Sequence, residues 1–135
     1  MTRILAIDWG EKRVGVAFSE GFLASPHSVI RRGSNVETYA KIEALVVETG
    51  AELLVMGLPT TFNPDEPLGF QAKRVLKHRD ALAERLAIPI KMVDETYTTV
   101  DAASYLHQAG KTGKIPIDAA AAAVILQHFL DEDES

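Results

Sequence analysis

The stretch ILAIDWGEKRVGVAFSE, residues 4–20, places one acidic residue, Asp8, at the end of an apolar run. Side chains alternate between the two faces of a strand, so Leu5 and Ile7 share one face and Asp8 belongs to the other. Gly10 follows shortly afterwards and supplies the backbone freedom of a tight turn. We therefore predict a strand that ends at Asp8, at the rim of a sheet where the strands open to solvent.

Apolar spacing and turn residues divide the rest of the chain into strands and helices. Short apolar runs predict strands, and apolar residues at helical spacing predict helices. Ser34 or Asn35 is the expected N-cap of the first helix, and Gly50 is its stop. The predicted strands cover residues 2–8, 12–19, 27–32, 52–57 and 88–95, the predicted helices cover about 36–49, 70–87, 98–108 and 117–131, and loops are expected at 58–69 and 110–114.

The order of these elements predicts an α/β fold. Three consecutive strands followed by alternating helix and strand favour a mixed five-stranded sheet, antiparallel on one side and parallel on the other, with helices packed against it. A chain of 135 residues has the length of one domain. We expect this domain to cover residues 1–130 and the acidic residues 131–135 to form a disordered tail.

Composition excludes several classes of function. The chain has no cysteine, which rules out disulfides, thiolate metal sites and a cysteine nucleophile. No apolar stretch reaches the roughly 18 residues of a membrane span and no signal peptide is visible, so the expected location is the cytoplasm. The net charge is −5, but four of the 19 acids lie at 131–134, which leaves 15 acids against 14 bases in residues 1–130. Net charge therefore does not exclude a nucleic-acid partner.

Three carboxylates stand where apolar elements begin or end, namely Asp8, Glu95 and Asp118. Hydrolysis of a phosphodiester with two divalent ions needs clustered oxygen ligands, and such clusters come from residues far apart in sequence. Five alanines at 119–123 would let the last helix approach the sheet closely and bring Asp118 toward Asp8. Local roles stay open, because Asp118 is also a suitable N-cap and Glu95 is also a suitable strand-end or capping residue.

Basic side chains suggest where a phosphate backbone could bind. Trp9 either packs at the rim or stacks on a base or ribose, and His128 is interpreted as an ordinary interface residue of the last helix. The candidate nucleic-acid-binding residues are Lys12 and Arg13 near the first turn, Lys73, Arg74, Lys77 and Arg79 on the exposed side of a helix, and Lys111 and Lys114 before the last helix.

Five different motifs follow one another along nearly the whole chain: LAIDWGEKRVGVAFSE, LLVMGLP, FQAKRV, VDETYTTVDAASYL and IDAAAAAVILQHFLD. Together they resemble the YqgF/RuvX family of Holliday junction resolvases and pre-ribosomal-RNA processing nucleases. The resemblance implies a ribonuclease H-like fold in which Asp8, Glu95 and Asp118 are the active-site acids. Thr96 stands where the family has an arginine, and the loop after Pro59 is longer than the family pattern, which leaves substrate preference open.

The leading hypothesis is an endonuclease that uses Mg²⁺ or Mn²⁺, held by Asp8, Glu95 and Asp118, to cut structured nucleic acid such as a ribosomal RNA precursor or branched DNA. A junction resolvase would be expected to act as a two-fold homodimer. Two alternatives remain. One is a binding module of the ribosomal or transcription machinery without catalysis, and the other is an ATP-binding fragment of the actin and sugar-kinase type, for which the chain is short.

Overall fold

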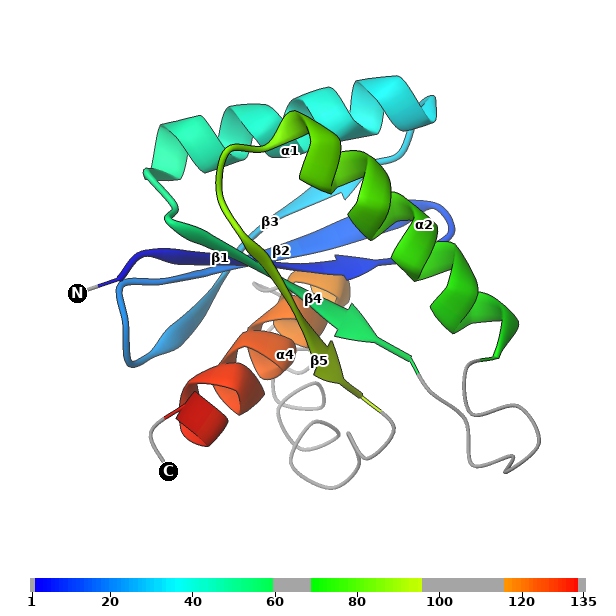
Figure 1. The fold of residues 1–135 in the computed structure, drawn as a ribbon. Coiled ribbons are helices and arrows are strands. Elements are labelled where there is room, and N and C mark those ends of the chain that lie inside the picture. Colours follow the sequence, from blue (N-terminus) through cyan, green and yellow to red (C-terminus); the bar gives the residue numbers. More distant parts are fainter. Residues whose placement is uncertain (1, 60–68, 96–115, 134–135) are drawn as a thin grey trace.

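A five-stranded mixed sheet forms the centre of the molecule (Figure 1). The computed structural model describes residues 2–59, 69–95 and 116–133. The strands lie in the order β3-β2-β1-β4-β5, with β1 antiparallel to β2, β2 antiparallel to β3, and β1, β4 and β5 parallel. This arrangement confirms the predicted sheet. Its strands are β1 (Ile4–Trp9), β2 (Arg13–Ser19), β3 (Ala24–Arg31), β4 (Leu53–Leu58) and β5 (Ile90–Asp94).

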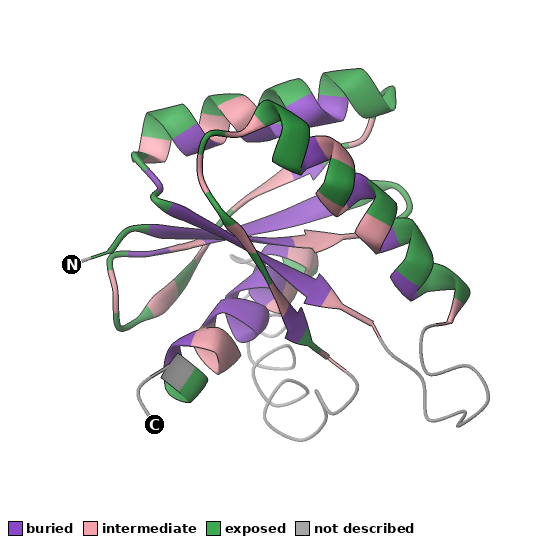
Figure 2. Ribbon diagram, viewed as in Figure 1, coloured by how far each residue is buried: buried purple, intermediate pink, exposed green. Residues whose placement is uncertain are grey.

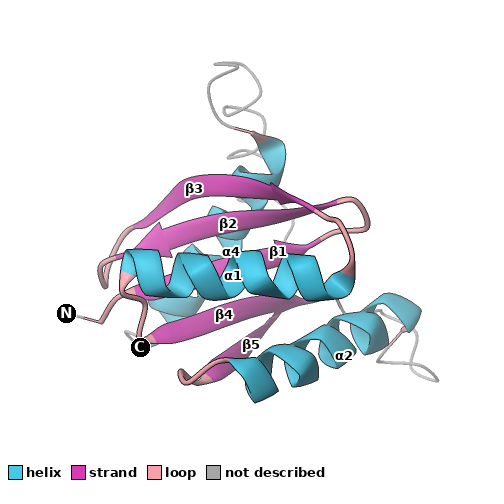
Figure 3. Cartoon of the chain, turned by 90° about the horizontal axis from the view of Figure 1, so that it is seen from above, coloured by secondary structure: helices cyan, strands magenta, loops and turns pink. Residues whose placement is uncertain are grey.

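Helices cover both faces of the sheet. Helices α1 (Asn35–Thr49) and α2 (Phe70–Arg85) lie on one face, and α4 (Ile117–Asp133) lies on the other (Figure 1). Seen from above, α1 runs over the middle of the sheet and α2 lies on the β5 side (Figure 3). The molecule therefore has three layers, with the strands between two helical layers.

The limits of α1 follow from its capping residues. The Ser34 side chain accepts a hydrogen bond from the Glu37 backbone N–H at 3.1 Å, and Gly50 ends the helix with a left-handed φ of 68°. A left-handed residue of this kind closes a helix at little cost when it is glycine. The predicted N-cap and stop are both confirmed.

Strand alternation divides the core into two clusters. Leu5 and Ile7 pack on the side of α1 and α2, whereas Ile4 and Ala6 pack on the side of α4, as the sequence predicted. Figure 2 shows buried residues along the central strands and exposed residues along the outer surfaces of α1 and α2. Asp8 continues the series of Ile4 and Ala6 and so belongs to the α4 side.

Small residues allow α4 to lie directly on the sheet. Ala119, Ala120, Ala122 and Ala123 are at most 2% exposed, and α4 packs mainly against β2, β3 and β1. A Cβ atom on Gly15 of β2 would overlap the main-chain oxygen of Asp118. The prediction that the alanines permit a close approach is confirmed, and Gly15 is the matching position on the sheet.

Two predicted boundaries are wrong. Strand β3 begins at Ala24 rather than at residue 27, because its pairing with β2 continues to Ser19 past a register shift at Val16/Ala17. Helix α4 continues to Asp133, so the acidic tail does not begin at residue 131. The Gln127 amide donates to Asp131 at 3.0 Å, an i to i+4 contact that supports this last turn.

The remaining boundaries agree to within about two residues. The helix expected at 98–108, the loop expected at 110–114 and most of the loop expected at 58–69 lie outside the described residues. Across the described ranges, none of the helices has both the length and the apolar character that crossing a bilayer requires.

Candidate active site

Asp8 and Asp118 form a pair of neighbouring carboxylates. Asp8 stands opposite Gly15 in the β1–β2 ladder, and the main chain at Asp118, in the first turn of α4, lies against that glycine. Burial, followed by the negative charge of Asp118, raises the pKa of Asp8. The structure thus brings together two acids that are 110 positions apart in the chain.

Glu95 reaches the same side of the sheet from the end of β5. Its backbone N–H donates to the carbonyl of Leu58 at 3.0 Å, which fixes it beside the end of β4. A Cβ atom on Gly57 would lie 3.3 Å from the Glu95 Cγ and 2.6 Å from Ile125 of α4. Gly57 therefore leaves the space in which the Glu95 side chain lies next to α4.

Electrostatic coupling links Glu95 to the other acids. Burial is the largest cause that raises the pKa of Glu95 to about 8, and the charges of Asp8, Asp94 and Glu132 raise it further. A buried carboxyl surrounded by like charges disfavours its ionised form. Shifts of this kind are typical of functional sites, although structural acid clusters also show them.

The donor chemistry of the three acids fits a divalent cation. Carboxylate oxygens are the ligands that Mg²⁺ and Mn²⁺ prefer, and a cation between them would offset the repulsion that, after burial, raises the pKa values of Asp8 and Glu95. In residues 2–59, 69–95 and 116–133, no three His, Cys, Asp or Glu side chains lie close enough to share one ion. Asp8, Glu95 and Asp118 therefore lie on one face of the sheet and are coupled by charge, but their side chains do not surround one common ion position.

A sequence model of the family described as RuvX, Holliday junction resolvase, matches residues 2–132. The chain belongs to the RuvX family. Relatives of the chain carry the name pre-16S rRNA nuclease, and two of them show the extent of the match. The relative from Mycobacterium leprae is 42% identical over 136 residues, which cover 96% of this chain and 73% of the relative. The relative from Crocosphaera subtropica is 38% identical over 133 residues, which cover 95% of this chain and 92% of the relative.

Solved structures confirm the ribonuclease H-like fold of this RuvX chain. RuvC of Thermus thermophilus, in complex with a Holliday junction substrate, matches with a TM-score of 0.68 and 15% identity, covering 100% of this chain and 97% of RuvC. Fowlpox virus resolvase, in complex with Holliday junction DNA, matches with a TM-score of 0.58 and 7% identity, covering 99% of this chain and 100% of the resolvase. At these identities the likeness concerns the fold. The nuclease and resolvase names within the RuvX family support an enzyme that hydrolyses phosphodiester bonds.

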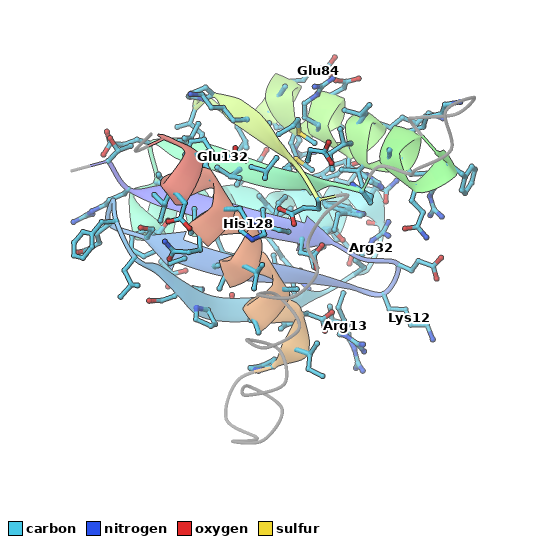
Figure 4. All side chains as sticks on the ribbon, turned by 90° about the horizontal axis from the view of Figure 1, so that it is seen from below. Lys12, Arg13, Arg32, Glu84, His128 and Glu132 are labelled. Carbon is cyan, nitrogen blue, oxygen red and sulfur yellow. The ribbon has the colours of Figure 1, made fainter. Side chains whose placement is uncertain are left out.

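Two predicted nucleic-acid-binding residues of the RuvX chain lie beside its acids. Lys12 and Arg13 lie next to each other at the turn between β1 and β2 (Figure 4). The Arg13 Nε donates to the Asp118 Oδ2 at 2.8 Å, in an ion pair that stays partly exposed. Lys12 is exposed. Arg13 is thus paired with an active-site candidate, and Lys12 extends the positive charge outward from it.

The predicted basic residues of α2 do not join the three acids. Lys73, Arg74, Lys77 and Arg79 belong to α2, which lies on the face of the sheet opposite α4 (Figure 1). Arg79 is paired with its neighbour Asp80, at 2.9 Å. The predicted sites at Lys111 and Lys114, and the departure at Thr96, lie outside the described residues.

One residue beside the acids was missed at the level of sequence. The His128 Nδ1 lies 3.5 Å from the Glu95 Oε1, so the interpretation of His128 as an ordinary interface residue is incomplete (Figure 4). The sequence signal that could have placed His128 near Glu95 is its spacing of three residues from Ile125. Residues three apart on a helix share a face, and Ile125 contacts the Gly57 position next to Glu95.

Proposed function

We propose that this RuvX-family chain is a divalent-metal-dependent endonuclease of the cytoplasm, with Asp8, Glu95 and Asp118 as its metal-binding and catalytic acids. The observation that carries the proposal is their grouping on the α4 side of the sheet, where burial and then the charges of neighbouring acids raise the pKa of Asp8 and Glu95. The positions match the acids that the family resemblance implies.

Mg²⁺ or Mn²⁺, when bound by these acids, would activate a water and stabilise the leaving oxygen of a phosphodiester. The residues of the chain prepare this chemistry in three ways. Asp8 and Asp118 keep two negative charges together on rigid elements, and Arg13 neutralises part of that charge in the absence of a cation. Glu95, with a pKa of about 8, is largely protonated at neutral pH and releases its proton as a cation binds.

The substrate that we propose first is a precursor of the small-subunit ribosomal RNA. Relatives 38–42% identical to this chain carry the name pre-16S rRNA nuclease. A four-way DNA junction is the second candidate, because the family itself is described by Holliday junction resolution. Symmetric cutting of a junction would require a two-fold homodimer, whereas removal of an RNA leader would not.

A cleavage assay on both substrates tests the function. The protein would be incubated with Mn²⁺ or with EDTA on a labelled ribosomal RNA precursor that carries its 5′ leader and, in parallel, on a labelled four-way DNA junction. Asp8→Asn removes one anionic ligand with little change of shape. Asp80→Asn makes the same chemical change on the exposed side of α2, far from the acids.

We expect metal-dependent cutting that survives in Asp80→Asn and falls at least a hundredfold in Asp8→Asn, in line with the loss of a metal ligand. Whether the RNA precursor or the DNA junction is cut faster identifies the substrate class. Cutting by folded Asp8→Asn at the wild-type rate would show that the acid assignment is wrong. Absence of both cutting and Mn²⁺ binding would favour the binding-module hypothesis.

A further inference from the structure

A second polar pocket lies on the opposite side of β1 from the three acids. Trp9 follows Asp8 in the strand, so its side chain lies on the α1 and α2 side and packs with that core cluster. The pocket has a volume of about 80 Å³ and opens to solvent. It lies between the β1–β2 turn, the residues after β3 and β4 and the first turns of α2, and its lining includes Trp9, Glu11, Arg32, Arg74 and His78.

Two buried hydrogen-bond donors in this lining have no acceptor. Within the part of the chain that the structure describes, the Trp9 Nε1 and the Arg32 Nε are buried and make no hydrogen bond. A buried N–H without a partner is destabilising, because the group has lost its hydrogen bonds to water, and native proteins keep few of them. Two such donors in one pocket indicate an acceptor that the described residues do not supply.

Both donors are held rigidly. The Trp9 ring stacks on His78 with 4.0 Å between ring centroids, and the His78 Nδ1 is 2.7 Å from the Tyr39 hydroxyl oxygen. The guanidinium of Arg32 donates through Nη1 to the carbonyl of Gly10 at 3.0 Å, lies over the Trp9 ring at 5.0 Å, and is held at Nη2 by Asn35. These contacts use the terminal nitrogens of Arg32 and leave its buried Nε without a partner among the described residues.

The charge of the pocket favours an anion. Arg32 and Arg74 both face His78, since burial and then these two positive charges lower the pKa of His78 to about 4. His78 is therefore neutral at physiological pH. The guanidinium of Arg74 lies over the Phe70 ring at 5.5 Å and makes no ion pair with any described residue. Among the described residues of the lining, Glu11 is the only acid, and the two arginines outweigh it.

We propose that this pocket binds a phosphate group. The tetrahedral oxygens of a phosphate can accept from the Trp9 Nε1 and the Arg32 Nε together, while the exposed guanidinium of Arg74 closes over a third oxygen. Hydrogen bonds between arginine and phosphate are charge-assisted and are roughly twice as strong as neutral ones. A neutral carbonyl ligand would satisfy the two buried donors but would leave Arg74 without a role.

The inference goes beyond the proposed nuclease function. The lining contains none of the three acids, and strand alternation puts Trp9 and Asp8 on opposite faces of β1. The phosphate could belong to a free ion or nucleotide, to the terminus of a nucleic acid, or to its backbone. All three sources offer the same oxygen acceptors, and the probes described next separate them.

Fluorescence gives a direct measurement, because Trp9 is the only tryptophan in the chain. The full-length protein would be titrated in EDTA, with ionic strength held constant by KCl. The probes are inorganic phosphate, a nucleoside monophosphate, and a short single-stranded oligonucleotide with or without a 5′-phosphate. Because EDTA prevents metal-dependent cleavage, the readout is independent of nuclease activity, and a failure of either proposal can be recognised separately.

Arg74→Gln removes one cation of the pocket from an exposed helical position, so the variant should fold. Lys41→Gln on exposed α1 makes the same charge change outside the pocket and is the matched control. Trp9→Phe keeps an aromatic ring but removes the N–H donor. This variant lacks the fluorophore, so its binding would be measured by calorimetry.

We expect a saturable change of Trp9 emission, weakened about tenfold in Arg74→Gln and unchanged in Lys41→Gln. Calorimetry should show a weaker site in Trp9→Phe as well. A response to inorganic phosphate or to the mononucleotide would identify a free ligand. A response only to the oligonucleotide with a 5′-phosphate would identify a nucleic-acid terminus. An equal response to both oligonucleotides would identify the nucleic-acid backbone. The proposal is overturned if no probe gives a saturable response, or if Arg74→Gln binds as tightly as wild type.

Discussion

Gly15 of β2 lies directly beneath the main-chain oxygen of Asp118, at the point where α4 begins. The contact leaves no room for a Cβ atom, so it ties a glycine inside a strand to the position of an active-site candidate. A glycine within a strand often marks a close approach of another backbone. Here that approach places Asp118 beside Asp8, which pairs with Gly15 in the sheet.

Gly15→Ala should destabilise the protein and separate the two acids. The added methyl group meets backbone atoms, which cannot move aside as a flexible side chain could, so we expect a loss of about 3 kcal/mol in the free energy of unfolding. Gly33→Ala is the matched control, because its Cβ would meet the flexible side-chain end of Glu37. Urea denaturation measures both, and equal losses in the two variants would contradict the prediction.

Glu95 should make the metal-free protein less stable as the pH rises. Its pKa is about 8 in the folded state against an ordinary value of 4.5, so the folded protein binds the proton more tightly than the unfolded chain does. The stabilising contribution of the protonated form is fully present below about pH 4.5 and is lost between pH 4.5 and 8. Glu95→Gln stays neutral and should therefore retain its stability over this range.

Urea denaturation in EDTA at several pH values measures this difference. Glu52→Gln provides the control, since it alters an exposed glutamate before β4 that is far from the acids. A wild-type profile parallel to that of Glu95→Gln between pH 4.5 and 8 would show that Glu95 is not perturbed by burial and its neighbours.

His78 should have the opposite effect in a lower range of pH. Its pKa falls from an ordinary 6.5 to about 4 in the folded protein, because burial and the charges of Arg32 and Arg74 disfavour the imidazolium. Stability that depends on neutral His78 is present above about pH 6.5 and is lost as the pH falls to 4. His78→Gln removes this loss, whereas His27→Gln, at an exposed position, should not.

The difference in unfolding free energy between wild type and His78→Gln isolates this contribution from that of the acids. We expect the difference to change in favour of the variant as the pH is lowered from 6.5 to 4. A difference that stays constant with pH would mean that His78 accepts a proton in the folded protein as readily as in the unfolded chain.

Arg13→Gln should strengthen the binding of Mn²⁺. Arg13 is 2.8 Å from the Asp118 Oδ2, so a cation that uses this carboxylate has to displace the guanidinium. Partly exposed ion pairs contribute about 0.2–1 kcal/mol, which corresponds to an increase in affinity of up to about fivefold. Titration followed by electron paramagnetic resonance of free Mn²⁺ measures it.

Arg31→Gln is the control for this experiment. Arg31 is exposed and stands opposite Arg13 in the β2–β3 ladder, so it carries the same charge nearby, and within the described ranges it forms no ion pair with Asp118. An equal gain of affinity in both variants would assign the effect to general charge. Weaker binding in Arg13→Gln would show that the ion pair supports the site instead of competing with the cation.

Local sequence patterns determined the kinds of elements in this protein. The alternation around Asp8, the caps of α1 at Ser34 and Gly50, and the order of strands and helices all follow from backbone geometry and from which side chains avoid water. They also showed that three acids stand at the ends of apolar elements. The extent of β3 and of the last helix escaped prediction, because strand pairing and helix packing extended them.

Tertiary structure decided which of these residues meet. Asp118 pairs with Arg13 and lies near Asp8, His128 lies beside Glu95, and Trp9 shares a pocket with Arg74. All three groupings join segments far apart in the chain. Contacts of this kind depend on which face of the sheet each helix covers and on where small residues allow a close approach. A local pattern fixes the face on which a side chain lies, but only packing of the whole chain supplies its neighbour.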